Sequence, residues 1–319
     1  MNCSIDKIVG LIKDIDNIKI VTHKNPDGDA IGSSFALYYA LLKLEKKVAV
    51  DLGEFFPPNY LFICSNYIQD ESFKQEYIIS VDLADANLLI DELKIYKDNI
   101  YISIDHHLSN RYYAKNTIVN SKSAATTELL YDIILKLIGK NEIDNNIATC
   151  LYLGLVTDTG CFKYSSTNAN THYIAAELIN LGAEYLLVNK LMFENKSRRR
   201  LQLEQEVILN MEYYFDYRCA LIYISMDLQD KYAILDDETE GFSAIPMQIE
   251  GIEIGITIKE KQKNEYKISI RTNEKYDASE ICKMWGGGGH KRAAGCVLLG
   301  EFMIIKSQIL DLIFNFIAD

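Results

Sequence analysis

The sequence of 319 residues predicts an α/β protein with two domains, an N-terminal parallel-sheet domain and a smaller C-terminal α/β domain, joined by a helical connector. Three observations support this prediction. The length exceeds that of one typical domain, short apolar runs alternate with helical patterns through the first half of the chain, and strand-like runs gather again after residue 211. We therefore expect domains at 1–183 and 211–319, with the connector at 184–210.

The first domain starts with an amphipathic helix over 1–16, which has one apolar face. Strands are then expected at 18–21, 47–52, 77–83 and 100–104, and helices at 30–43, from 84 to about 96, and at 123–139, 142–156 and 171–181. The strands at 77–83 and 100–104 are almost wholly apolar, so both of their faces should be covered, as in a parallel sheet. Residues 157–160 are expected to form a polar turn.

The connector and the second domain have residue patterns that differ from those of the first domain. Residues 184–210 contain neither Pro nor Gly, so they are expected to be helical rather than a flexible linker, with Arg198–Arg200 on a solvated face. In the second domain we expect strands at 220–224, 252–258 and 266–271 and an apolar helix at 302–317. A helix is also expected to start after the glycine run 286–289.

Composition excludes several classes of protein. The net charge of −12 argues against a protein that coats duplex DNA, but it does not exclude a small phosphorylated ligand in a local pocket. No apolar run approaches the roughly 18 residues of a membrane span, and charges interrupt any signal-peptide core near the N-terminus. The 7 cysteines include no CxxC pair, which favours free thiols in a reducing cytoplasm.

Polar residues gather after the predicted strands. His23, Asp27 and Asp29 follow the first strand within seven residues, and an imidazole with two carboxylates in so short a turn can converge on a divalent cation. The alternative is a solvated turn in which Asp29 caps the next helix. Asp82 ends an apolar strand, which is costly unless the carboxylate is paired or binds a metal, so we favour Asp82 as a ligand and Asp85 as a helix cap.

The two adjacent histidines follow the fourth strand in the sequence Asp105-His106-His107. Because neighbouring side chains of an extended chain point to opposite sides, one histidine should bind the cation. The other should face a substrate phosphate or support the ligand. Asp158 alone would be a turn residue, and it becomes a candidate because the other clusters need a further carboxylate.

The candidate metal ligands are therefore His23, Asp27, Asp29, Asp82, His106 and Asp158. All of them lie at or just beyond the ends of predicted strands or helices, where open α/β sheets bind ligands. So many ligands suit a pair of cations about 3.5–4 Å apart that clamps a phosphoryl group for in-line attack. The lack of thiolates argues against structural zinc, and the mixture of carboxylate and imidazole suits Mn²⁺, with Mg²⁺ or another divalent cation as an alternative.

The glycine run Gly286–Gly289 precedes His290 and matches neither the GxxxxGK[ST] nor the GxGxxG pattern. One alternative is a flexible tether, but tethers are usually longer and contain Ser. Successive glycine N–H groups can face an anion. Lys and Arg also outnumber Asp and Glu between residues 261 and 300, so we favour a phosphate pocket that includes Arg271 and His290.

Taken together, five motifs resemble the DHH phosphoesterase superfamily with its DHH-associated C-terminal domain, in the layout of the stand-alone oligoribonuclease (nano-RNase) and pAp phosphatase group. They are His23-Lys-Asn-Pro-Asp27-Gly-Asp29, Val81-Asp82-Leu-Ala-Asp85, Asp105-His106-His107, Thr157-Asp158-Thr-Gly160 and Gly-Gly-Gly-His290-Lys-Arg-Ala-Ala-Gly295. The resemblance implies two Mn²⁺ ions in the first domain, one held by His23, Asp27 and Asp82 and the other by Asp29, Asp82, His106 and Asp158. It implies Asp82, His106 and His107 as catalytic residues, and His107, Arg271, Gly287, Gly288, Gly289 and His290 as substrate-binding residues between the domains.

The resemblance also implies a cytoplasmic hydrolase that cleaves RNA of a few nucleotides to mononucleotides and removes the 3′-phosphate from pAp. Its partners would be short single-stranded RNA, dinucleotides and pAp, with no duplex DNA and no membrane, and a homodimer is left open. Two alternatives remain: a phosphodiesterase that acts on linear or cyclic dinucleotide second messengers, and a non-catalytic nucleotide-binding module. A non-catalytic module would be expected to have lost some of the metal-ligand residues, and the sequence retains all of them.

Overall fold

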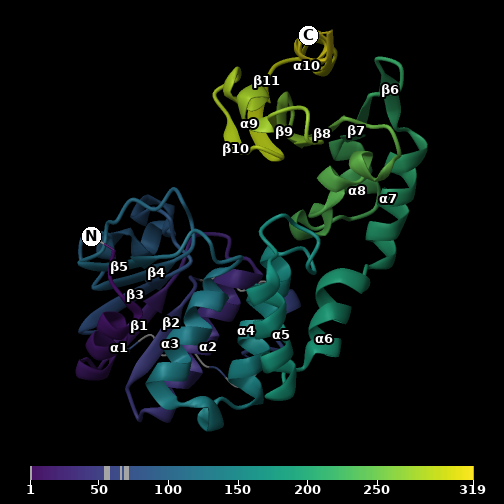
Figure 1. Cartoon of the computed structure of the whole chain (residues 1–319). Helices are drawn as coiled ribbons and strands as arrows, with labels where there is room; N and C mark the ends of the chain where they lie inside the picture. The colour runs from purple at the N-terminus through teal and green to yellow at the C-terminus, as the bar shows by residue number, and fades with distance from the viewer. Residues whose placement is uncertain (1, 54–57, 65–66, 68–71, 319) are drawn as a thin grey trace. The chain divides into compact units, whose positions relative to one another are not determined.

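A computed structural model describes residues 2–53, 58–64, 67 and 72–318 of the chain (Figure 1). This described part divides into two compact units, Met1–Asn195 and Lys196–Asp319. Helix α6 (Tyr185–Asn189), a π-helical turn (Lys190–Glu194) and helix α7 (Arg198–Leu209) occupy most of the stretch predicted as a connector.

The first unit contains, within the described residues, a five-stranded parallel sheet in the order β2-β1-β3-β4-β5. The strands are β1 (Ile18–Val21), β2 (Val48–Asp51), β3 (Tyr77–Val81), β4 (Ile102–Asp105) and β5 (Asn116–Val119). The predicted parallel sheet is therefore confirmed, with β5 as an additional strand. From β1 the chain adds β2 on one side of β1, and it then returns to add β3 on the other side of β1. The border between β1 and β3 is therefore the switch point at which such sheets bind ligands.

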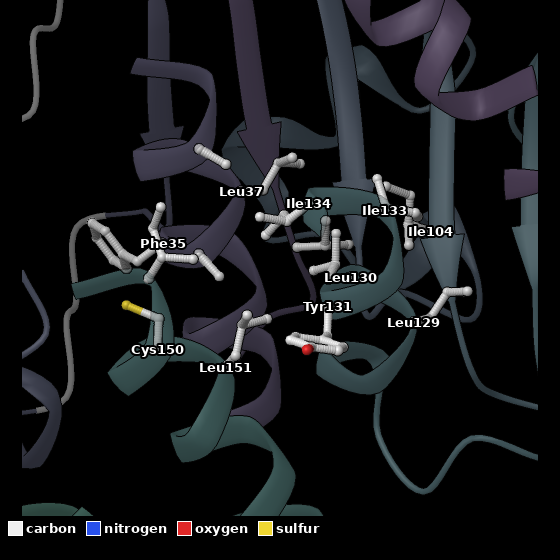
Figure 2. Packing of buried hydrophobic residues seen from close by; sticks show 14 of the residues in the cluster. Phe35, Leu37, Ile104, Leu129, Leu130, Tyr131, Ile133, Ile134, Cys150 and Leu151 are labelled. Atoms are coloured by element: carbon white, nitrogen blue, oxygen red, sulfur yellow. The ribbon is translucent and has the colours of Figure 1, made fainter. Parts of the chain in front are cut away.

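Besides α6, five α-helices of the described residues belong to this unit: α1 (Ile5–Asp14), α2 (Gly28–Lys43), α3 (Thr126–Ile138), α4 (Asn145–Asp158) and α5 (Ala169–Asn180). Figure 2 shows how Phe35 of α2, Leu130 of α3 and Leu151 of α4 pack in one core with Ile104 of β4. Burial of each such side chain contributes about 1.5–3 kcal/mol. The core thereby fixes the helix ends from which the polar residues project.

Helices α2 and α4 pack closely because both carry glycine where they meet. A Cβ atom on Gly32 would lie 2.4 Å from the carbonyl oxygen of Cys150, and one on Gly154 would lie 2.4 Å from Asp29 Oδ1. Only glycine permits such an approach. It brings the first turn of α2, with Asp29, beside the last turn of α4, which ends in Asp158.

Two local predictions in this unit are wrong. Residues 157–158 are not a turn, because α4 continues to Asp158, and the Thr157 hydroxyl donates to the Leu153 carbonyl oxygen (2.9 Å) within its last turn. The helix expected between 84 and 96 is replaced by the 3₁₀ turns Ala86–Leu88 and Asp91–Tyr96, since Leu89 and Ile90 have ψ angles of 151° and 154°. Asp85 caps the first turn, as predicted, by accepting from Asn87 N.

The second unit contains, in its described residues, a six-stranded sheet in the order β10-β11-β9-β8-β7-β6, which confirms the predicted second α/β domain. Its strands are β6 (Glu212–Tyr214), β7 (Cys219–Ile224), β8 (Ile254–Gln262), β9 (Glu265–Thr272), β10 (Gly288–His290) and β11 (Ala293–Leu299), and its helices after α7 are α8 (Met226–Lys231), α9 (Ala278–Lys283) and α10 (Phe302–Ala318). Isoleucines of β8 and β9 pack against those of α10 in its core.

The glycine run does not precede a helix, contrary to the prediction. It leads into the β10–β11 hairpin, in which Gly289 has a φ of 150° and a Cβ atom would lie 2.5 Å from the Ala293 carbonyl oxygen. Gly287 is equally confined, since its Cβ would lie 2.3 Å from the Gly295 carbonyl oxygen. Gly287 and Gly289 therefore allow a neighbouring strand to approach, a role that a sequence pattern for helices cannot reveal.

Arginines 199 and 200 are not on a fully solvated face. Arg199 pairs with Glu238 (2.7 Å), and the Arg200 guanidinium lies over the Phe242 ring, while Arg198 is exposed. All 7 cysteines lie in the described ranges and are free thiols, as expected. Among the described residues, no helix combines the length and apolarity needed to cross a membrane.

Candidate metal centre

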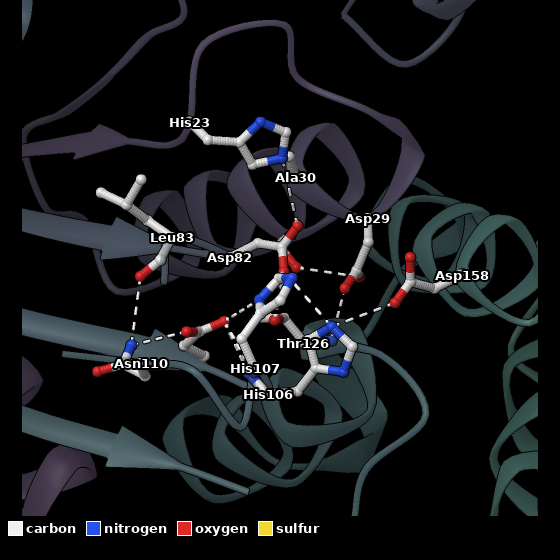
Figure 3. A network of polar contacts seen from close by, with 12 residues as sticks. His23, Asp29, Ala30, Asp82, Leu83, His106, His107, Asn110, Thr126 and Asp158 are labelled. Atoms are coloured by element: carbon white, nitrogen blue, oxygen red, sulfur yellow. Dashed lines mark hydrogen bonds and ion pairs between the residues drawn. The ribbon is translucent and has the colours of Figure 1, made fainter. Parts of the chain in front are cut away.

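Seven polar side chains of the described residues converge where the strands of the first sheet end (Figure 3). His23 follows β1, Asp27 and Asp29 flank the start of α2, Asp82 follows β3, His106 and His107 follow β4, and Asp158 ends α4. The structure thus brings together every residue predicted as a metal ligand. It places them after β1, β3 and β4, next to the β1/β3 switch point, and at the start of α2 and the end of α4.

Asp82 lies at the centre of this cluster and is almost fully buried. Its Oδ2 lies 3.7 Å from His23 Nε2, and its Oδ1 lies 3.8 Å from His106 Nε2. Its φ of 52° is a left-handed conformation that costs a residue other than glycine about 1–2 kcal/mol. The backbone N–H donates to the Ile104 carbonyl oxygen (3.0 Å) in this conformation, which turns the side chain toward the histidines.

Three overlapping groups of the described residues could each hold a cation, and the ligand atoms within each group lie within 4.8 Å of one another. They are His23–Asp27–Asp82, Asp29–His106–Asp158 and Asp82–His106–His107. Each group combines imidazole nitrogen with carboxylate oxygen and contains no thiolate. This donor set fits Mn²⁺ or a similar divalent cation.

Two of the histidines are oriented in the same way. The Nδ1 atoms of His23 and His106 contact the carbonyl oxygens of Lys24 (2.9 Å) and Ser123 (3.2 Å). A ring that donates through Nδ1 presents Nε2 as its ligand nitrogen, the arrangement usual for metal-binding histidines. His107 differs, because its Nδ1 lies 2.7 Å from Oδ1 of the buried Asp105.

The carboxylates of Asp27 and Asp29 have separate structural roles. Asp27 caps α2 by accepting from the backbone N–H groups of Asp29 and Ala30 (3.1 and 3.0 Å), so Asp29 is not the cap of its own helix. Asp29 accepts instead from the first amides of α3, those of Thr126 (2.6 Å) and Thr127 (3.1 Å). It therefore supplies the cap that Ala125, at the N-cap position of α3, cannot provide.

Crowding of buried carboxylates makes the cluster electrostatically strained without cations. Burial and the charges of Asp82 and Asp158 raise the pKa of Asp29 well above its usual value. Burial, together with the charges of Asp82 and Asp27, raises the pKa of Asp158 to about 8. Such shifts are typical of sites in which bound cations relieve the repulsion.

The same surroundings favour the charged form of His23 and the neutral forms of Asp29 and Asp158. Burial lowers the pKa of His23, but contact with Asp82 and the charge of Asp27 outweigh this effect and raise it to about 9. Burial also disfavours ionised Asp82, yet its contacts with His23 and His107 hold its pKa below the usual value. Asp82 is therefore the carboxylate of the cluster that stays ionised most readily.

Sequence reasoning missed three residues that support the cluster. The Thr126 hydroxyl donates to Asp82 Oδ1 (2.9 Å), Asp105 holds His107, and Asn110 donates to Asp105 Oδ2 (2.6 Å). Asp105 could have been found, because it is an acidic residue at a buried strand end like Asp82. Thr126 and Asn110 give no such signal, since their contacts lie 44 and 5 positions away in the chain.

Of the predicted substrate-binding residues, His107 lies in the first unit, in the polar cluster, whereas Arg271, Gly287–Gly289 and His290 lie in the second unit. Arg271 of β9 and His290 of β10 are both paired with Ala293 of β11, so they lie in one row across the sheet. Side chains of directly opposed residues share a face. Arg271 Nε also donates to Ser243 Oγ at 3.3 Å, and Gly287–Gly289 adjoin the same row.

Comparison with known proteins identifies the class. Residues 17–155 match the DHH family, N-terminal domain, and residues 233–313 match the DHHA1 domain. The chain therefore carries a DHH domain followed by a DHHA1 domain. These two matches agree with the motifs from which the sequence suggested the family.

Individual relatives provide a more detailed comparison than the domain families. The chain is similar to the bifunctional oligoribonuclease and PAP phosphatase NrnA of Thermus thermophilus, with 29% identity over 89% of this chain and 84% of that protein. It is 26% identical to a probable protein of the same name from Streptococcus mutans, over 90% of this chain and 91% of that protein. An exopolyphosphatase-related protein from Bacteroides fragilis has a crystal structure that matches with a TM-score of 0.87 and 28% identity, over 98% of this chain and 95% of that one.

Proposed function

We propose that this protein is a metal-dependent phosphoester hydrolase that degrades short oligoribonucleotides to mononucleotides and removes the 3′-phosphate from pAp. The observation that carries the proposal is the position of Asp82, whose two oxygens face His23 on one side and His106 on the other. One carboxylate can then serve two adjacent cations. The names of the relatives from Thermus and Streptococcus support the choice of substrates.

The proposed ligands divide into two sets that share Asp82. His23 and Asp27 complete one set, and Asp29, His106 and Asp158 complete the other, in agreement with the side-chain groups in the structure. Two bound Mn²⁺ ions would supply a water of lowered pKa and charge neutralisation at the phosphoryl oxygens. The chain contributes the preorganised ligands, because Asp29 and Asp82 are both held by Thr126.

His107 has a different proposed role. Its Nδ1 is engaged by Asp105, and its Nε2 has no hydrogen-bond partner among the described residues. We assign this free nitrogen to a phosphate oxygen of the substrate, with His107 as a catalytic residue beside Asp82 and His106. The ring is already oriented in the free protein, so little ordering remains for substrate binding.

The second unit would recognise the rest of the nucleotide. Arg271 and His290 share a row of one sheet, and Gly288 near them has open space where a side chain would stand. Cationic side chains of this kind bind phosphate. The acidic net charge of −12 supports small substrates over duplex DNA, and the free thiols support a cytoplasmic location.

A substrate panel with Mn²⁺ tests the proposal. It contains pApA, longer RNA, pAp, pGpG, cyclic dinucleotides and polyphosphate, and Asp82→Asn serves as the inactive control. We expect the highest kcat/KM for short RNA, turnover of pAp, and none of either by the Asp82 variant. A preference for pGpG or cyclic dinucleotides would contradict the substrate assignment. Nucleotide binding without any turnover would make the protein a binding module.

A further inference from the structure

We propose that Asn110 is a positioning residue for the reaction, which holds the Asp105 carboxylate and through it the ring of His107. The inference rests on the proposed function, because it assumes that His107 acts on the substrate. Asn110 touches none of the proposed metal ligands through a hydrogen bond in the described structure. It lies three positions beyond the motif that contains the two histidines.

Both ends of the Asn110 amide are fixed, and the side chain is buried (7% exposed). Its Nδ2 donates to Asp105 Oδ2 at 2.6 Å and to the Leu83 carbonyl oxygen at 3.3 Å. Its Oδ1 accepts from the Tyr112 N–H at 2.7 Å. The orientation of the amide is thus determined, since a flipped amide would place its oxygen against the Asp105 carboxylate.

Asp105 is fully buried, and its two oxygens have different partners. Oδ1 lies 2.7 Å from His107 Nδ1 and accepts from the backbone N–H groups of His106 (2.8 Å) and His107 (3.2 Å). In the described residues, Oδ2 has Asn110 as its hydrogen-bond partner. A buried carboxylate that loses the partner of one oxygen must rotate or admit water, and either change disturbs its other oxygen.

Asn110 also ties together the ends of two neighbouring strands. Leu83, whose carbonyl it contacts, directly follows Asp82 at the end of β3, while Asp105 ends β4. Figure 3 shows the amide between the Leu83 carbonyl and the carboxylate beside the histidines. The loop after β4 therefore returns a side chain to hold the two strand ends on which Asp82 and His107 depend.

Tyr113 provides a matched control. Its hydroxyl donates to the same Leu83 carbonyl oxygen (2.7 Å) and contacts Ser80 and Ser103, but it makes no hydrogen bond to Asp105 or His107 in the described structure. Tyr113→Phe and Asn110→Ala both remove a buried hydrogen bond to Leu83. Only Asn110→Ala removes the bond to Asp105, so a difference between the variants reports on the proposed role.

The first measurement is steady-state kinetics with pApA and Mn²⁺. We expect Asn110→Ala to lower kcat about 10–100-fold, the range found when supporting groups of metal sites are lost. The KM for pApA should change little, and Tyr113→Phe should keep a kcat near that of the wild type. Asn110→Ser is measured in parallel, so that an unstable Ala variant does not decide the result. A wild-type kcat in a folded Asn110 variant would overturn the proposal. Equal losses of kcat in the Asn110 and Tyr113 variants would also overturn it.

The second measurement needs no turnover, so it separates failure of this inference from failure of the proposed function. Nuclear magnetic resonance of histidine-labelled, metal-free protein should show a His107 Nδ1 proton protected from exchange by Asp105. We expect this signal to persist in Tyr113→Phe and to be lost in Asn110→Ala and Asn110→Ser. Persistence of the signal in both Asn110 variants would overturn the inference even if the enzyme hydrolyses RNA as proposed.

Discussion

Asp29, in the first turn of α2, accepts a hydrogen bond of 2.6 Å from the backbone N–H of Thr126, the first residue of α3, 97 positions later in the chain. A proposed metal ligand is therefore also the cap of another helix. This carboxylate serves both the fold and the site, so its removal should affect both the stability of the protein and the binding of metal.

Substitutions at position 29 should separate the two roles. In metal-free protein we expect Asp29→Ala to lower the free energy of unfolding by about 1 kcal/mol, because the amides of Thr126 and Thr127 lose their acceptor. Asp29→Asn keeps an acceptor oxygen for one of the two amides and removes a carboxyl group whose pKa is raised by burial, so it should be destabilised less than Asp29→Ala. Denaturant-induced unfolding in the presence of a chelator measures the order of stability of the wild type and the two variants. Equal destabilisation by both variants would refute the capping role.

Metal binding should release protons and strengthen as the pH rises. In the metal-free protein the pKa values of Asp158 and His23 are raised to about 8 and about 9. Both groups therefore hold a proton below those values, and a cation must displace it. Calorimetry of Mn²⁺ binding in buffers of different ionisation enthalpy should show proton release near neutral pH. Affinity independent of pH, with no proton release, would contradict the assignment of these ligands.

The Thr126 hydroxyl should matter for the metal rather than for the fold. It donates to Asp82 Oδ1 at 2.9 Å, and loss of such a bond typically weakens a metal site about 10–100-fold. Thr126→Val removes the hydroxyl at nearly constant volume, and Thr126→Ser keeps it. We expect weaker Mn²⁺ binding in the Val variant alone, measured by titration against a metal-sensitive dye. Equal affinities in the two variants would show that the hydroxyl does not position Asp82.

The second unit should affect substrate use without affecting the metals. His290 and Arg271 lie in the six-stranded sheet, whereas the predicted ligands all belong to the first unit. His290→Ala should therefore raise the KM for pApA and leave the Mn²⁺ stoichiometry unchanged. A loss of bound metal in this variant would show that the glycine-rich segment has been assigned the wrong role.

Strand positions in the first unit could be predicted because a buried parallel strand leaves a strong signal. The apolar runs expected as strands at 18–21, 77–83 and 100–104 locate β1, β3 and β4, and the carboxyl ends of parallel strands share one edge of the sheet. His23, Asp82 and His106 could for that reason be expected to meet. Their role as metal ligands stays a prediction.

The remaining features depend on contacts that a local pattern does not encode. Helix α4 continues to Asp158, where the hydroxyls of Thr157 and Thr159 bond back to helix carbonyls, although Thr and Gly in the sequence indicated a turn. The glycines before His290 admit a neighbouring strand rather than begin a helix. Asn110 lies in a loop, and only tertiary folding brings its amide to Leu83 and Asp105.

Anomalous diffraction at the manganese edge, from crystals of the protein grown with Mn²⁺, tests whether Asp82 serves two cations. We expect two peaks that both contact the Asp82 carboxylate, one beside His23 and Asp27 and the other beside His106 and Asp158. A cluster without any anomalous peak, or one whose single peak lies away from Asp82, would refute the proposed metal centre.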